Sequence, residues 1–109
     1  MTMKQIAKKL GLEALAGGKG LDREVKNVYI CDLLSFAMSK APADSVWITV
    51  MGNVNAVAVA SLADVAGILL VENAAADADM LKKADEKEVA VLKCGGSAFE
   101  IGKAISDLI

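Results

Sequence analysis

The stretch from Val46 to Val71, VWITVMGNVNAVAVASLADVAGILLV, decides the fold of this chain. It reads as a β-branched and aromatic strand over residues 46–50, a polar turn over 51–55, a small apolar helix over 56–66 and a second strand over 67–71. Two uninterrupted hydrophobic strands joined by a helix of this length predict a parallel βαβ unit that is covered on both faces. The polar turn would then lie at the carboxyl edge of the sheet, where open α/β folds bind their ligands.

Helices and strands alternate on both sides of this unit. Before it, the patterns predict a helix over 3–10, a short strand over 12–16, a strand over 25–30 and a helix over 31–38; after it, a helix over 77–87, a strand over 89–92 and a helix over 98–109. This alternation predicts one α/β domain over residues 1–109, with three layers (α/β/α) and a mainly parallel sheet of about five strands. The first short strand is expected to pair antiparallel at one edge.

The bulk composition excludes several classes of partner. The 109 residues carry a net charge of −2 with no basic cluster, which predicts no nucleic-acid binding and no attraction to anionic membranes. Residues 45–63 lack charge, but Gly52, Asn53 and Asn55 interrupt them, so a buried βαβ unit explains this run better than a membrane span. The first residues lead into an amphipathic helix and not into a signal peptide, so we expect a cytoplasmic protein.

Histidine is absent, which removes His-based triads, His general bases and most zinc sites. The two cysteines, Cys31 and Cys94, are isolated, and we expect them to be unpaired, buried small side chains. No catalytic group of residues is visible. The sequence therefore predicts a protein that is not an enzyme, with no metal and no cofactor.

Four polar loops should meet at the carboxyl edge of the sheet, and three of them run directly into helix N-termini, which attract anions. The hypothesis is a small pocket there for a phosphate-bearing or nucleotide-like ligand. Its candidate residues are Asp32, Asn53, Asn55, Glu72, Asn73, Gly95, Gly96 and Ser97.

The same residues also have purely structural interpretations. Asn53 and Asn55 are good helix caps, and Asp32 would complement a helix dipole. The turn 95–97 is neither G-x-G-x-x-G nor a Walker sequence, and it can be a plain strand-to-helix connection. Glu72 can be a solvated residue at a strand end.

A family resemblance rests on several segments taken in order. Ala16-Gly17, then Leu21-Asp22-Arg23-Glu24-Val25, then Tyr29-Ile30-Cys31-Asp32-Leu33-Leu34, followed by 46–50, 55–60 and 66–71, together resemble the DRTGG domain family. The resemblance implies a three-layer fold similar to the N-terminal domain of HPr kinase/phosphorylase and, more remotely, to the uridine-nucleotide-binding domain of Mur ligases. Relatives accompany CBS pairs and phosphate acetyltransferases as sensory or regulatory modules, and stand-alone copies in anaerobes can lie beside hydrogenase genes.

The chain departs from the family pattern in one place. Many relatives carry an Asp-Arg pair between the central strand and the next helix, where this chain has Gly52-Asn53-Val54-Asn55. Without an arginine to bind phosphate or carboxylate, the site favours a neutral ligand, a nucleobase recognised by amide groups, or no ligand. No P-loop is present either.

These observations lead to one functional expectation and two alternatives. The chain is expected to be a non-catalytic regulatory or accessory domain, a homodimer whose interface takes up surplus apolar surface, with a small ligand at the carboxyl edge of the sheet. The alternatives are a nucleotide or phosphometabolite sensor and a hydrogenase-associated accessory protein.

Overall fold

A five-stranded sheet with the strand order β1-β5-β4-β3-β2 forms the centre of the computed structural model, which describes residues 1–109. Strands β2, β3, β4 and β5 run parallel, and β1 pairs antiparallel with β5 at one edge, as the sequence predicted. The elements in chain order are α1 (Met3–Leu10), β1 (Glu13–Ala16), the 3-10 helix η1 (Gly18–Asp22), β2 (Asn27–Ile30), α2 (Leu34–Lys40), β3 (Ser45–Thr49), α3 (Val54–Ala63), β4 (Gly67–Leu70), α4 (Ala78–Lys87), β5 (Ala90–Lys93) and α5 (Ala98–Leu108).

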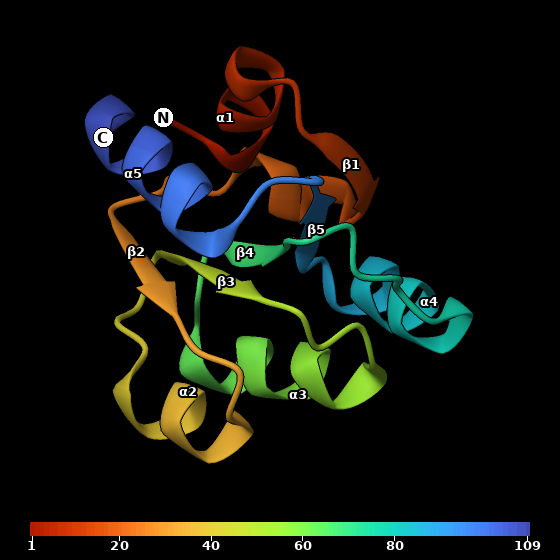
Figure 1. Cartoon of the computed structure of the whole chain (residues 1–109). Coiled ribbons are helices and arrows are strands. Elements are labelled where there is room, and N and C mark those ends of the chain that lie inside the picture. The colour runs from red at the N-terminus through yellow and green to blue at the C-terminus, as the bar shows by residue number, and fades with distance from the viewer.

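Helices cover both faces of the sheet, which confirms the three-layer α/β/α arrangement. Helices α1 and α5 lie on one face, and α2, α3 and α4 lie on the other (Figure 1). The strands alternate between the two: Val46 and Ile48 of β3 pack toward α1 and α5, whereas Trp47 packs toward the opposite helices. Because both faces are buried, every residue of β3 and β4 is inaccessible to solvent, and this explains their continuous apolar sequence.

The starts of two helices differ from the sequence prediction. Helix α2 begins at Leu34 and not at Cys31, because the residues before it form a loop that bends at Asp32 and is extended at the cap, Leu33. Helix α3 begins at Val54, two residues before the predicted start, because Asn53 caps it, and it ends at Ala63 where Asp64 adopts a left-handed conformation (φ 58°).

The segment before β2 is bound to the N-terminus of the chain. The Val25 N–H donates to the carbonyl of Met1 (2.8 Å), and Thr2 forms a bridge with Glu24. As a result β2 begins at Asn27, two residues later than the predicted strand over 25–30.

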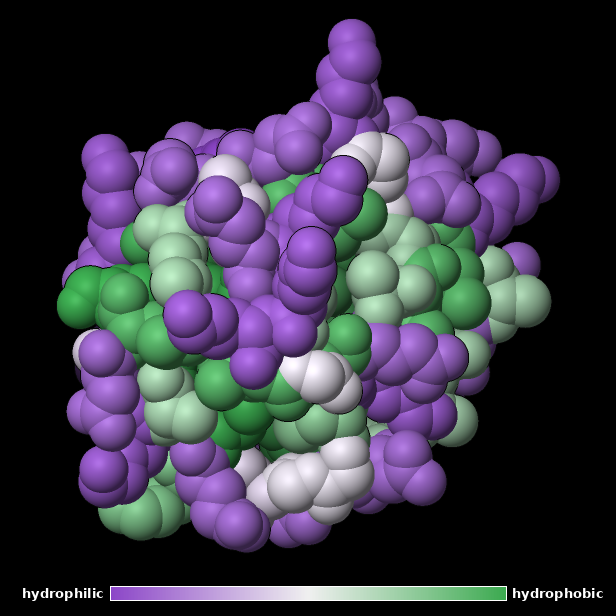
Figure 2. Space-filling view, turned by 90° about the horizontal axis from the view of Figure 1, so that it is seen from above, coloured by the Kyte–Doolittle hydropathy of each residue, from purple (hydrophilic) through white to green (hydrophobic).

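The outer surface is mixed in character. Figure 2 looks down on the face formed by α1 and α5 and shows apolar areas exposed between polar side chains. None of the helices has both the length and the apolar character needed to cross a membrane.

Candidate functional site at the carboxyl edge of the sheet

The four parallel strands end at one edge of the sheet, and their following loops lie beside one another there. The loops are residues 31–33, 50–53, 71–77 and 94–97. Main-chain hydrogen bonds join them: the Asn73 N–H donates to the Cys94 carbonyl (2.9 Å), and the Asp77 N–H donates to the Gly52 carbonyl (2.8 Å). The shared edge predicted from the sequence therefore exists, and we call these four loops the rim.

Asp32 fixes the loop after β2 to the end of β3. Its Oδ1 accepts hydrogen bonds from the Thr49 hydroxyl (2.8 Å) and from the Val50 N–H (3.0 Å). The Thr49 side chain is buried, so its hydroxyl needs this partner. Asp32 makes no hydrogen bond to α2, which starts two residues later with Leu33 as its cap, so its interpretation as a complement to the helix dipole stays a prediction.

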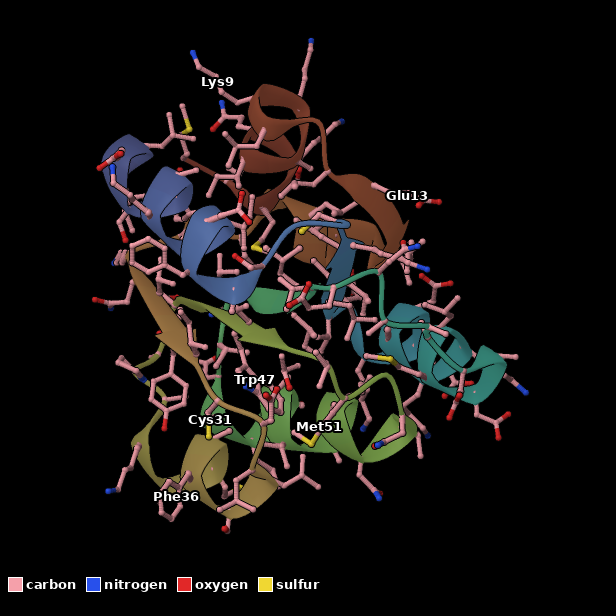
Figure 3. All side chains as sticks on the ribbon, viewed as in Figure 1. Lys9, Glu13, Cys31, Phe36, Trp47 and Met51 are labelled. Carbon is pink, nitrogen blue, oxygen red and sulfur yellow. The ribbon has the colours of Figure 1, made fainter.

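A second bond holds the same loop. The buried Trp47 indole donates from Nε1 to the carbonyl of Cys31 (2.9 Å). In Figure 3, Cys31, Trp47 and Met51 lie between the sheet and α2 and α3, whereas Phe36 points away from the sheet. Both cysteines are free and only partly buried, so the prediction of buried cysteines is wrong for each.

The two asparagines of the loop after β3 have different roles. The Asn53 side-chain oxygen accepts from the N–H groups of Asn55 (3.0 Å) and Ala56 (3.3 Å), which confirms Asn53 as the cap of α3. Asn55 is not a cap, because it lies one residue inside the helix with an exposed side chain. It lines an open groove of about 530 Å³ between α2 and α3, together with Leu34, Ser35, Met38, Ala58 and Val59.

Glu72 and Asn73 form a left-handed turn, with φ of 55° and 57°. Their main-chain N–H groups are both engaged, Glu72 with the Gly96 carbonyl (2.9 Å) and Asn73 with the Cys94 carbonyl (2.9 Å). The structure thus brings Glu72 and Asn73 against the glycine turn that follows β5.

The glycine turn has a property that the fold itself does not require. Neither Gly95 nor Gly96 has a positive φ, and a Cβ at either position would meet open space. Gly52 is the opposite case, since a Cβ there would lie 1.8 Å from the Ala75 carbonyl oxygen. Gly95 and Gly96 leave the backbone bare on the exposed side of the rim, whereas Gly52 is needed for close packing of two loops.

Three helices of ten or more residues begin at the rim, and the N-termini of two of them, α3 and α5, are already occupied by polar side chains of the chain, whereas Asp77 makes no side-chain hydrogen bond at the start of α4. Ser97 and Glu100 form a capping box: the Ser97 Oγ accepts from the Glu100 N–H (3.2 Å), and the Glu100 carboxylate accepts from the Ser97 hydroxyl (2.9 Å). This carboxylate takes the place where an anion would bind at α5, as the Asn53 side chain does at α3. The four loops contain no lysine and no arginine.

Exposed apolar side chains surround the rim, and the sequence interpretation missed them. They follow the strand ends or open the helices: Ile30, Leu33, Val50, Val54 and Phe99. Phe99 is 73 % exposed, in the first turn of α5. The signal that could have revealed them is the position of large apolar residues next to turns, outside the periodic core pattern. The rim thus offers apolar surface and bare backbone, which suit a neutral or aromatic group better than a phosphate.

Ionic contacts concentrate at the other end of the parallel strands, before β3 and β4 begin. The Arg23 guanidinium bonds to Asp44 (2.8 Å) and Asp64 (3.1 Å), and the hydrogen bond from Arg23 holds the pKa of Asp44 below its usual range. Both carboxylates in turn raise the pKa of Arg23, with the bond to Asp44 the largest cause. Desolvation and the neighbouring Cys31 thiol raise the pKa of Tyr29. No three His, Cys, Asp or Glu side chains form a group that could hold a metal ion.

Comparisons with known proteins give a family and a fold. The model of the DRTGG domain family matches residues 5–108. A similar solved structure is that of the CBS and DRTGG domains of the regulatory region of Clostridium perfringens pyrophosphatase, complexed with its activator diadenosine tetraphosphate. The TM-score is 0.76 at 11 % sequence identity, over 95 % of this chain and 45 % of that one. This chain thus corresponds to less than half the length of the chain in that structure. Among curated proteins, none matches this chain.

Proposed function

Because the chain belongs to the DRTGG domain family, we propose that it is a non-catalytic regulatory domain that acts as a homodimer and binds a small ligand at the rim. Family membership and the regulatory region that shares its fold support the regulatory role. The proposal places the domain in the cytoplasm, where the free thiols of Cys31 and Cys94 would stay reduced.

The observation that carries the ligand site is the pair Gly95 and Gly96. Their backbone conformation and surroundings would accept a side chain, yet both positions have none. Bare backbone next to the Glu72–Asn73 turn lets a ligand approach the N–H groups of Gly95 and Gly96 closely, while the Gly96 carbonyl already accepts from the Glu72 N–H. The candidate contacts are therefore Gly95, Gly96 and Ser97, with Glu72 and Asn73 beside them and Asp32, Asn53 and Asn55 as outer supports.

The chemistry of the rim favours the base of a nucleotide as the group that is recognised. An aromatic base would pack on the exposed apolar side chains, such as Val50 and Phe99, and main-chain groups would read its edge. The Glu100 carboxylate would repel a phosphate at the N-terminus of α5. A sensor of nucleotides is thus the more specific form of the proposal, and the activator in the similar regulatory region, diadenosine tetraphosphate, is a dinucleotide.

A thermal-shift and calorimetry panel tests this proposal with adenosine, AMP, diadenosine tetraphosphate and inorganic phosphate. A ligand at about 100 times its dissociation constant should add about 2.7 kcal/mol to the free energy of unfolding. We expect adenosine and AMP to act alike and phosphate to have no effect. A shift with AMP and phosphate but not with adenosine would contradict recognition through the base, and no shift with any compound would contradict nucleotide binding.

Substitutions would place the site. A Cβ at Gly96 meets open space, so Gly96→Leu should cover the bare backbone and abolish any ligand-induced shift while the unliganded protein stays folded. Leu62→Ser is the matched control, because Leu62 is 73 % exposed on α3 and lies outside the four loops. Equal ligand shifts in both variants would move the site away from the rim.

A further inference from the structure

Strand β2 is an edge strand, and its side that faces away from β3 is unpaired. It is the last strand in the order β1-β5-β4-β3-β2, and its four residues, Asn27 to Ile30, contain no charge, no proline and no bulge. The other edge strand, β1, carries Glu13 and an irregularity between Ala14 and Ala16. Proteins use such charges and bulges to block edge-to-edge pairing, so only the β2 edge is open to another strand.

The register shows which main-chain groups face outward. Strand β2 pairs in parallel with β3 from Asn27 opposite Ser45 to Ile30 opposite Ile48, and the Cys31 N–H donates to the Ile48 carbonyl (3.2 Å). In a parallel ladder, alternate residues bond to the same neighbour, so Asn27 and Tyr29 also bond to β3. The N–H and C=O groups of Val28 and Ile30 therefore point away from the sheet.

Exposed aromatic and aliphatic side chains flank this edge on both faces. On one face, Ile30 is 50 % exposed and Phe99 is 73 % exposed. They line an open groove of about 480 Å³ between β2 and α5 with Val28, Tyr29, Gly102, Lys103 and Ser106. On the other face, the Tyr29 hydroxyl lies 3.4 Å from the carbonyl of Phe36, whose ring is 48 % exposed.

We propose that β2 pairs antiparallel with β2 of a second copy of this chain, which joins the two sheets into one of ten strands. This inference rests on the homodimer of the proposed function and names its interface. Antiparallel pairing satisfies all the outward groups in one register, with Val28 opposite Ile30 of the other copy and Tyr29 on the two-fold axis. Four main-chain hydrogen bonds form, and the two Tyr29 rings become close cross-strand neighbours.

Charge complementarity in this register singles out a second copy as the partner. Counting outward from Tyr29 brings Lys26 to the bend that contains Asp32 of the other copy, just beyond the paired residues, twice per dimer. The Lys26 side chain is 70 % exposed, with only a 3.8 Å contact to Asp44, and Asp32 uses only its Oδ1 within the chain. Because β2 itself is uncharged, no like charges face each other across the axis.

A single cysteine tests the register directly. Asn27 lies opposite Cys31 of the other copy, in a non-hydrogen-bonded pair whose Cα atoms should be about 4.5 Å apart, within disulfide range. Asn27→Cys, combined with Cys94→Ser, should therefore cross-link two chains under air oxidation, and the dimer should be the main species on a non-reducing gel. Within one chain these positions are four residues apart on an extended strand, about 13 Å, too far for a disulfide.

Matched controls separate this register from chance oxidation. Adding Cys31→Ser to the same variant should abolish the cross-link, and Cys94→Ser alone should give none. Sedimentation of the wild type runs in parallel. A dimer that does not cross-link would overturn β2 pairing and keep the homodimer, whereas a monomer would overturn both and leave the ligand panel to decide the regulatory role.

A second variant weakens the pairing without touching the bonds to β3. Ile30→Pro removes an outward N–H in each copy, two of the four hydrogen bonds, and an edge strand tolerates proline at such a position. We expect the dimer dissociation constant to rise at least about tenfold, with Leu62→Ser as an exposed apolar control that leaves it unchanged. An Ile30→Pro protein that melts like the wild type and still dimerises with equal affinity would overturn the proposal.

Discussion

Asp32 and Thr49 are joined by a hydrogen bond of 2.8 Å between the carboxylate and the hydroxyl, and this bond ties the end of β2 to the end of β3. Thr49 is one of two buried polar or charged residues of the chain, with 1 % of its surface exposed. The pair therefore contributes to stability and also sets the shape of the rim.

Asp32→Ala should lower the free energy of unfolding by about 1–3 kcal/mol, because it leaves a buried hydroxyl without its acceptor. Asp32→Asn should cost less, since an amide oxygen still accepts. Urea denaturation measures both, and Glu72→Ala, a change at an exposed rim residue with no side-chain hydrogen bond, is the control. Equal losses from Asp32→Ala and Glu72→Ala would show that the bond to Thr49 adds nothing.

The glycines of the rim should respond in opposite ways to alanine. Gly52→Ala places a Cβ against the Ala75 carbonyl and should destabilise the fold by more than about 2 kcal/mol, because backbone must move. Gly95→Ala and Gly96→Ala should stay within about 1 kcal/mol of the wild type, because their surroundings are open. Thermal or urea melts of the three variants measure these stabilities. A Gly52→Ala protein as stable as the wild type would contradict the close contact of the two loops.

The cap of α3 gives a third test. Asn53→Ala should cost about 1 kcal/mol, since the N–H groups of Asn55 and Ala56 lose their acceptor. Asn55→Ala changes an exposed side chain two residues further along, inside the helix, and should leave the free energy of unfolding almost unchanged. Chemical denaturation of the pair would contradict the assignment if Asn55→Ala proved the more costly change.

The ion pair between Arg23 and Asp44 predicts a dependence of stability on pH. The folded-state pKa of Asp44 is lowered, so the pair stabilises the fold above the unfolded carboxyl pKa of about 3.9 and is lost as the pH falls through the folded value. The difference in unfolding free energy between the wild type and Arg23→Gln should therefore be constant from about pH 5 to 8 and shrink below about pH 4. Melts across this range measure the difference; if it persists undiminished at pH 2, Arg23 acts through its packing and its hydrogen bond to the Asp64 main-chain carbonyl and not through the ion pair.

Much of the fold could be predicted from the sequence, because the elements that decide it are buried on both faces. Strands β3 and β4 are continuous apolar runs, and this pattern correctly predicted their parallel pairing and the shared edge. The family prediction, made on segments in order along the chain, is confirmed by the match over residues 5–108. The likeness to HPr kinase and Mur ligase domains stays a prediction, as do the single domain and the ligand contacts.

The helix starts and the character of the rim were harder to predict. The start of α2 depends on Asp32 reaching Thr49, a contact between residues 17 positions apart that local patterns do not contain. The exposure of Phe99 depends on which elements fail to cover it, and a single sequence shows that a residue is apolar but not whether a neighbour packs on it. Capping preference suited both Asn53 and Asn55, and only the backbone path selects between them.

The bonds from Asn73 to Cys94 and from Asp77 to Gly52 have a mechanical consequence. They link the turns that follow β3, β4 and β5 to one another, so we expect a ligand that displaces one of these turns to displace the other two and the helices that follow them.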